Sequence, residues 1–137
     1  MEVRIGNNSE YLLLRNITLE SLQNYFYNTT IEIHLNGFSS NIKAFGEINE
    51  LTGLILNLKK LYQKLDFQFT FGNLEDNIGI TVQTNPTNAG QIELKGFLKN
   101  SYGTGKLEFK IVTDQSYLPE TINQLEIVLS DLKINTK

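Results

Sequence analysis

The chain has 137 residues, of which 40% are hydrophobic and 20% charged, and this length and balance fit a single domain over residues 1–137 with its own core. It contains no cysteine, which excludes disulfides, thiolate nucleophiles and Cys-based zinc sites, and its 15 acids against 12 bases argue against a reader of nucleic-acid phosphates. No run is long and apolar enough for a membrane span and the first residues form no secretory apolar segment, so we expect a cytoplasmic protein without a membrane partner.

The first third of the chain predicts strands. Residues 3–5 form a short strand and residues 10–19 a longer one, whose apolar phase shifts after Leu14 and indicates a bulge near Arg15 and Asn16. Residues 21–28 mix aromatic and loop-forming side chains, and we interpret them as a loop. Residues 31–36 alternate cleanly, with His34 on the polar face, and residues 42–45 form the next strand.

A change from alternation to helical spacing follows. Apolar residues recur at steps of three and four and predict one helix: Ile48, Leu51, Ile55, Leu58, Tyr62 and Leu65. Asn49 is the expected N-cap, and Glu50 lies in the first turn, where the helix dipole favours an acid. Gly53 is expected to let the helix approach a sheet closely.

The second half repeats the change from strands to a helix. Strands are predicted at residues 67–71, 78–82, 92–98 and 107–112, and Phe67, Phe69 and Phe71 share one face as a sheet core. A loop at residues 100–105 joins the last two strands. Pro119 fits the first position of a final helix, and Leu118 before it is expected outside the helical region.

These elements predict an α+β fold. The order is β-β-β-β-α-β-β-β-β-α, with about eight strands in antiparallel sheets that two amphipathic helices cover. We find no internal repeat in the sequence.

No residue pattern indicates a reaction centre. The only histidine, His34, lies on the polar face of a strand, which favours a solvated side chain over a catalytic base or a metal ligand. The run from Gly103 to Lys106 lacks the spacing of a phosphate-binding loop and precedes a strand, so it predicts a hairpin turn. We therefore expect no catalytic residue, no metal and no cofactor.

Two pairs of carboxylates could in principle perform acid–base chemistry. They are Glu47 with Glu50, and Glu75 with Asp76. Each pair lies at a turn or a helix start, where acids commonly serve capping and solubility. We interpret both pairs as structural.

Aromatic residues in loops are the best candidates for recognition. Tyr25, Tyr27 and Tyr102 lie in the segments interpreted as loops, and exposed aromatic side chains on loops often anchor protein partners. We expect all three to contact a partner, and their replacement by alanine to weaken that complex without lowering thermal stability.

Four ordered segments carry a resemblance to a known family. The most specific is the joint where a strand ends in Thr113-Asp114-Gln115-Ser116-Tyr117-Leu118 before the last helix. The others are Gly37-Phe38-Ser39, Leu58-Lys59-Lys60-Leu61-Tyr62 and Gly90-Gln91-Ile92-Glu93-Leu94-Lys95-Gly96. Together they resemble the WapI-type immunity proteins, which are cytoplasmic antitoxins associated with wall-associated polymorphic toxins of bacteria.

The resemblance implies a protein that inhibits without catalysis. Its partner would be the C-terminal effector domain of a cognate toxin, often a nuclease, and a mildly acidic surface suits a basic partner. Asp114 and Pro119 then belong to a structural corner, with Asp114 bonding backbone amides of the turn. Two other functions stay open: a small-molecule-binding or hydrolytic domain, which requires a perturbed carboxylate or tyrosine in a cleft, and a structural adaptor.

Overall fold

The described part of the chain forms two four-stranded antiparallel sheets and two helices, which confirms the predicted α+β class. The computed structural model describes residues 1–19, 25–64 and 66–134. The N-terminal sheet contains β1 (Glu2–Gly6), β2 (Tyr11–Leu19), β3 (Phe26–Leu35) and β4 (Phe38–Glu47), and α1 (Ile48–Gln63) follows it. The C-terminal sheet contains β5 (Gln68–Gly72), β6 (Ile78–Thr84), β7 (Gln91–Lys99) and β8 (Lys106–Asp114), then a 3₁₀ turn (Gln115–Tyr117) and α2 (Leu118–Ile134).

The architecture repeats one unit, β-β-β-β-α, although the sequence shows no repeat. Within each sheet the strands lie in chain order and every neighbouring pair is antiparallel, as short connections require. The repeat is therefore one of element order and strand pairing.

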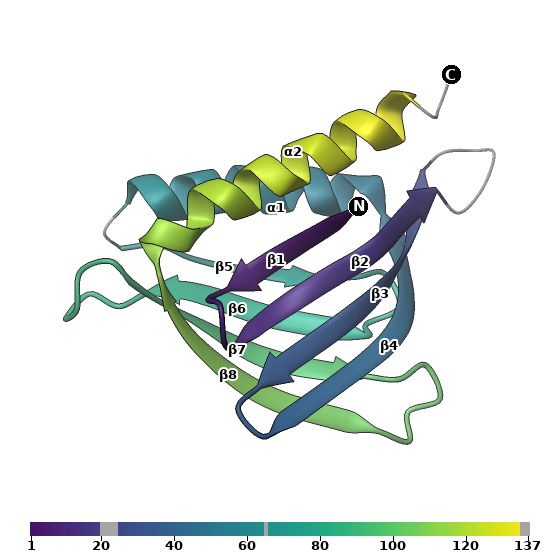
Figure 1. Cartoon of the computed structure of the whole chain (residues 1–137), viewed down its shortest axis with the longest axis horizontal. Coiled ribbons are helices and arrows are strands. Elements are labelled where there is room, and N and C mark those ends of the chain that lie inside the picture. The colour runs from purple at the N-terminus through teal and green to yellow at the C-terminus, as the bar shows by residue number, and fades with distance from the viewer. Residues whose placement is uncertain (20–24, 65, 135–137) are drawn as a thin grey trace.

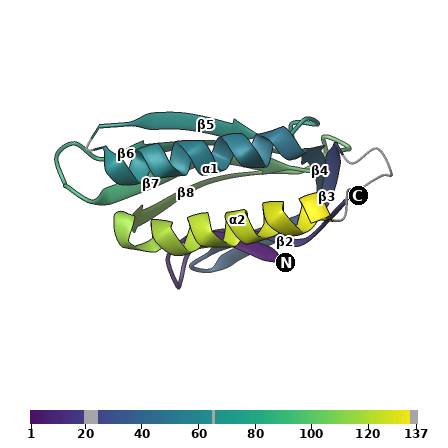
Figure 2. The ribbon, with the colours of Figure 1, turned by 90° about the horizontal axis from the view of Figure 1, so that it is seen from above.

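The two sheets face each other, and both helices lie along one side of the pair (Figure 1). Seen from above, α1 runs beside β5 (Figure 2), and α2 runs along β1 (Figure 1); these element pairs are in contact. The inner faces of both sheets and the apolar stripes of both helices form one core. Its fully buried members include Ile5, Leu12, Leu14, Ile31, Ile33, Leu51, Leu58, Ile78, Leu94, Ile111, Leu125 and Leu132.

The predicted bulge in the second strand is confirmed. The pairing of β2 with β3 shifts register between Arg15 and Thr18, and Asn16 adopts φ 53° to accommodate the extra residue. The loop expected at residues 21–28 is wrong at its end, because β3 already begins at Phe26. Residues 21–24 and Leu65 lie outside the described residues.

The start of α1 differs from the prediction. Glu47 occupies the N-cap position without a side-chain capping bond, and Asn49 lies inside the first turn, so its assignment as N-cap is wrong. Glu50 does lie in the first turn. Gly53 faces open space, since a Cβ atom added there would meet nothing within 4 Å, so it does not bring the helix close to a sheet.

The corner between β8 and α2 is a 3₁₀ turn. The Asp114 carboxylate accepts hydrogen bonds from the Ser116 backbone N–H at 2.8 Å and from the Ser116 hydroxyl, as expected for this residue. Leu118, however, is helical (φ −68°, ψ −40°), because the 3₁₀ turn runs directly into α2 and the Leu118 side chain is buried in the core. Pro119 is therefore the second residue of α2, where the missing N–H still leaves no partner unsatisfied.

Candidate functional site

One end of the molecule presents large apolar side chains on its connections. The beginning of α1, the β5–β6 turn and the β7–β8 loop all lie at this end (Figures 1 and 2). Tyr25 precedes β3 and is 71% exposed, Leu74 in the β5–β6 turn is 53% exposed, and Tyr102 in the β7–β8 loop is 90% exposed. We call this surface, made of residues 25, 47–50, 73–77 and 100–105, the loop end.

A buried pair of asparagines ties the segments of the loop end together. The Asn73 carboxamide donates to the Phe45 carbonyl at 3.0 Å and accepts from the backbone N–H groups of Asn77 and Ile78 at 2.7 and 3.1 Å. The Asn77 carboxamide donates to the Lys99 carbonyl at 3.2 Å. Since buried amides that lose a partner cost about 1–3 kcal/mol each, this network holds the turn and both flanking strands in one arrangement.

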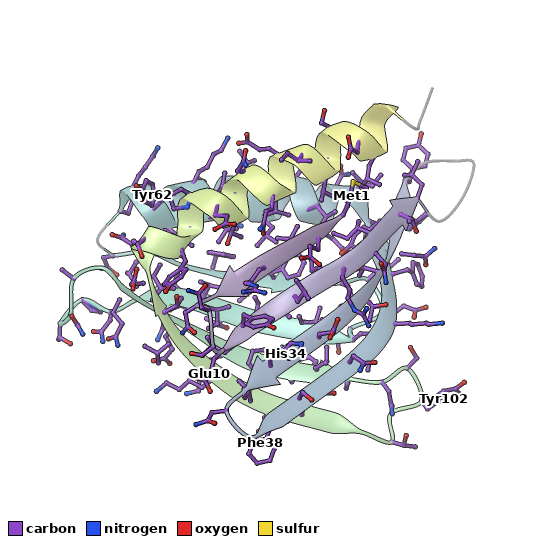
Figure 3. The ribbon with its side chains drawn as sticks, in the orientation of Figure 1. Met1, Glu10, His34, Phe38, Tyr62 and Tyr102 are labelled. Atoms are coloured by element: carbon purple, nitrogen blue, oxygen red, sulfur yellow. The ribbon has the colours of Figure 1, made fainter. Side chains whose placement is uncertain are left out.

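The β7–β8 loop is shaped by one residue. The Asn100 carboxamide oxygen accepts from the Thr104 backbone N–H at 3.1 Å, and the Asn100 backbone N–H donates to the Gly105 carbonyl at 3.1 Å. Gly103 adopts φ +72°, which a glycine tolerates without strain. The segment is thus the hairpin connection that the sequence predicts, and Tyr102 projects from it into solvent (Figure 3).

Tyr27 does not belong to the exposed surface. It lies in β3, its side chain is 2% exposed, and its hydroxyl donates to Glu50 Oε1 at 3.4 Å. The expectation of an exposed loop aromatic is wrong at this position because strand alternation turns Tyr27 toward the core, whereas Tyr25 precedes the strand. Gly46 lies on the neighbouring strand opposite Tyr27 and leaves room for the ring.

Both acidic pairs of the sequence meet at the loop end. Glu47 and Glu50 flank the start of α1, while Glu75 and Asp76 follow Leu74 in the next turn. Lys99 offsets one of these charges through an ion pair with Asp76 at 3.0 Å. The loop end therefore combines exposed apolar side chains with a negative rim.

The surroundings of Glu50 alter the proton affinity of its carboxyl group. Partial burial raises the pKa of Glu50, and the neighbouring charge of Glu47 adds to the increase, while hydrogen bonds from the Glu47 and Leu74 backbone amides oppose it. Burial also raises the pKa of Tyr27 far above its ordinary value, so this phenol stays protonated and serves as a donor to Glu50. The hydrogen bond between Tyr27 and Glu50 thus connects the core to the loop end.

An open cleft of about 730 Å³ lies at the opposite end of the molecule, between the β1–β2 turn, the β6–β7 connection and the β8–α2 corner. Its lining is polar and includes Asn7, Ser9, Gln91, Asp114 and Ser116. Tyr27 and Glu50, whose pKa values are raised, are not part of this lining. The corner residue Asp114 thus serves one wall of the cleft as well as the turn.

A metal cluster and a membrane-spanning helix each place requirements on the described residues. Within residues 1–19, 25–64 and 66–134, no group of three or more His, Asp or Glu side chains is arranged to hold a metal ion. Neither helix, over the same ranges, is long and apolar enough to cross a membrane. His34 lies on the outer polar face of β3, as the alternation predicts.

Sequence reasoning overlooked Leu74. It is a single apolar residue in a turn that is otherwise formed by asparagine, glutamate and aspartate, and this contrast with its neighbours was the available signal. The structure places the Leu74 backbone within hydrogen-bonding reach of Glu50 at the start of α1, and the Leu74 side chain is exposed.

A solved structure shares this fold. A chain from the "Crystal structures of trypanosoma bruciei MRP1/MRP2" superimposes with a TM-score of 0.51 over 94% of this chain and 82% of that chain, at 12% sequence identity, and shows a shared fold alone. No curated protein sequence matches this chain significantly. The model of the immunity protein WapI-like family matches residues 3–133, which is nearly the whole length. The chain therefore belongs to the WapI-like family of immunity proteins.

Proposed function

We propose that this protein is an antitoxin that binds the effector domain of a cognate bacterial polymorphic toxin in the cytoplasm and occludes it without catalysis. Family membership supports an immunity role and a protein partner. The single observation that carries the proposed contact surface is the loop end, where Tyr25, Leu74 and Tyr102 are exposed at one end of the fold.

The chemistry of the loop end fits a protein partner with a basic surface. Exposed tyrosines supply large contact areas at low entropic cost and are frequent among residues that dominate binding energy. The rim of Glu47, Glu50, Glu75 and Asp76 attracts a basic surface and raises the association rate. A nuclease effector carries such a surface because it must bind phosphates.

The rigidity of the loop end also favours recognition. Its turns are held by buried carboxamide bonds, so few side chains must be ordered when the complex forms. The hydrolytic alternative lacks comparable support, because Tyr27 and Glu50 have raised pKa values but do not line the open cleft at the other end of the molecule.

The test is binding to the effector domain of the toxin encoded beside this chain. Co-expression should restore growth, and the purified pair should form a complex by gel filtration and calorimetry. Tyr25→Ala, Leu74→Ala and Tyr102→Ala should each weaken binding, and the triple variant by about a hundredfold or more, a change of about 2.7 kcal/mol.

Phe38→Ala is the matched control. Phe38 is equally aromatic and 68% exposed, but it is the first residue of β4 and lies apart from Tyr102 (Figure 3). Its replacement should leave the affinity unchanged. A complex that tolerates the triple variant but loses affinity with Phe38→Ala contradicts the proposed surface, and continued toxicity without a complex contradicts the antitoxin role.

A further inference from the structure

The outer edge of β4 directs backbone groups away from the N-terminal sheet. β4 is the last strand of this sheet and pairs on one side only, with β3, in an unbroken register (Figure 1). The Ile48 N–H donates to the Tyr25 carbonyl at 2.9 Å, and this pair sets the alternation, so that even-numbered residues of β4 bond to β3. The odd-numbered residues of β4 therefore direct their N–H and C=O groups away from β3.

The Asn73 side chain agrees with this alternation. Its carboxamide donates to the Phe45 carbonyl at 3.0 Å, so this carbonyl points away from β3 and has a partner. Ser39, Asn41 and Lys43 have the same direction as Phe45. Within the described residues, their N–H and C=O groups form no hydrogen bond. Such a row of free backbone groups is a template for one more strand.

The other sheet edges are covered or charged. On β1, the Arg4 N–H donates to Gln124 Oε1 at 2.8 Å and the Arg4 carbonyl accepts from Thr121 Oγ1, so α2 closes this edge. The edge strand β5 has α1 beside it (Figure 2). On β8, the Val112 carbonyl accepts from Asn7 Nδ2 at 3.0 Å. The remaining outward positions of β8 carry charges that discourage strand addition, namely Lys106, Glu108 and Lys110.

We propose that two copies of this chain pair through their β4 edges, antiparallel about a twofold axis at Asn41, and form one continuous sheet. In this register Asn41 lies opposite the partner's Asn41, and Ser39 lies opposite the partner's Lys43. Each of these pairs exchanges two N–H···O bonds. A twofold interface satisfies both edges at once, so association stops at the dimer. The proposal does not depend on the antitoxin role.

The side chains along β4 suit a second copy. Lys43 is the only charged residue of the strand before Glu47, and it lies opposite the partner's Ser39, so no like charges meet directly. Phe38 is 68% exposed and shares a side of the strand with the buried Ala44, and in the dimer it lies opposite the partner's Ala44. Phe38→Ala should therefore weaken self-association without changing toxin affinity, because the loop end does not include Phe38.

Self-association and amide exchange of the full chain test the pairing. Sedimentation from about 10 µM to about 1 mM should show a monomer–dimer equilibrium, because one strand pair makes a small interface. Hydrogen exchange by NMR should slow at the amides of Ser39, Asn41 and Lys43 only in the concentrated sample. Asn41→Pro removes an N–H that β3 does not use and should weaken the dimer by about tenfold or more. Asn41→Ala keeps this donor and should change the affinity by less than about threefold.

Substitutions at Ser39 test the register. Ser39→Glu places a carboxylate opposite the partner's Lys43 at both symmetric positions and should strengthen the dimer by about threefold or more. Ser39→Lys places like charges there and should weaken the dimer by a similar factor. Thr70→Glu, at an exposed position of β5, is the matched control with the same change in net charge. It should not strengthen the dimer, since the chain already has a net charge of −3 and further negative charge raises repulsion.

The contrary outcomes are equally defined. A chain that stays monomeric at about 1 mM, or a dimer whose outward β4 amides exchange as fast as in the monomer, would overturn the proposal. Equal effects of Ser39→Glu and Thr70→Glu would also overturn it, because the proposed register brings only Ser39 to a lysine. Protection that appears only when the toxin effector domain is added would assign the edge to that partner instead of a second copy. Amide spectra establish that each variant is folded, and if Asn41→Pro is not, the two Ser39 variants decide.

Discussion

Replacing Tyr27 by alanine tests the division between core and contact surface. The side chain is 2% exposed, so its loss opens a cavity in the space between β3 and the start of α1. Truncation of a buried aromatic ring to alanine costs about 3–5 kcal/mol. Tyr25→Ala and Tyr102→Ala remove side chains that are 71% and 90% exposed, and each should change stability by less than about 0.5 kcal/mol.

These energies convert into clearly separated melting temperatures. An unfolding entropy of about 2.1 cal/mol/K per residue over 137 residues gives about 0.29 kcal/mol/K. Tyr27→Ala should therefore lower Tm by about 10–17 °C, and the two exposed tyrosine variants by less than about 2 °C. Tyr27→Phe removes only a hydroxyl whose bond to Glu50 is long, and should lower Tm by at most about 5 °C.

Thermal unfolding followed by circular dichroism measures these differences in Tm, and urea titration gives a second measure of stability. If Tyr27→Ala does not fold, Tyr27→Leu can replace it because leucine keeps most of the buried side-chain volume. The Tm of Tyr27→Leu should still lie clearly below the Tm of both exposed variants. Equal Tm values for the alanine variants of Tyr25, Tyr27 and Tyr102 would refute the burial of Tyr27.

Three further outcomes are expected. Gly96→Ala should lower the free energy of unfolding by about 1–3 kcal/mol or more, because the added Cβ would collide with the Gly79 carbonyl oxygen on the paired strand. Gly53→Ala in α1 should raise the free energy of unfolding by about 0.5–1 kcal/mol, because its added methyl group meets nothing within 4 Å. Urea titration measures both changes. Glu50→Gln should raise Tm at pH 7, because the raised pKa of Glu50 means that its ionisation destabilises the fold. This gain in Tm should vanish at pH values below the ordinary pKa of glutamate. Glu75→Gln, at an exposed position of the β5–β6 turn, is the control over the same pH range. Asp114→Ala should cost about 1 kcal/mol through loss of the bond to the Ser116 amide, and an unchanged Tm would contradict a capping role.

Alternation and helical spacing predicted the architecture because both report on which side of an element is buried. The strands and helices of the described residues, their order and the bulge at Asn16 follow from this pattern. The errors lie where backbone context overrides a local preference. Leu118 is helical before a proline because the 3₁₀ turn and the core hold it there, and Asn49 is inside α1 because the helix begins at Ile48.

The contact surface was harder to predict than the fold. Tyr25 and Tyr27 are two residues apart in an aromatic run, and only the start of β3 decides that one is exposed and the other buried. Arg4 on β1, Tyr11 on β2 and His34 on β3 stack on one another because of strand register, and no local motif brings these residues together.

The sequence by itself determined the fold class, the absence of cysteine chemistry and the family, because these depend on composition, periodicity and a few ordered segments. Tertiary structure alone decided which acids share an end with Leu74 and Tyr102, how the two sheets face each other, and which side chains of neighbouring strands stack on one another. The physical reason is that surfaces are assembled from turns and strand faces distant in the chain, whose proximity is set by core packing and strand register.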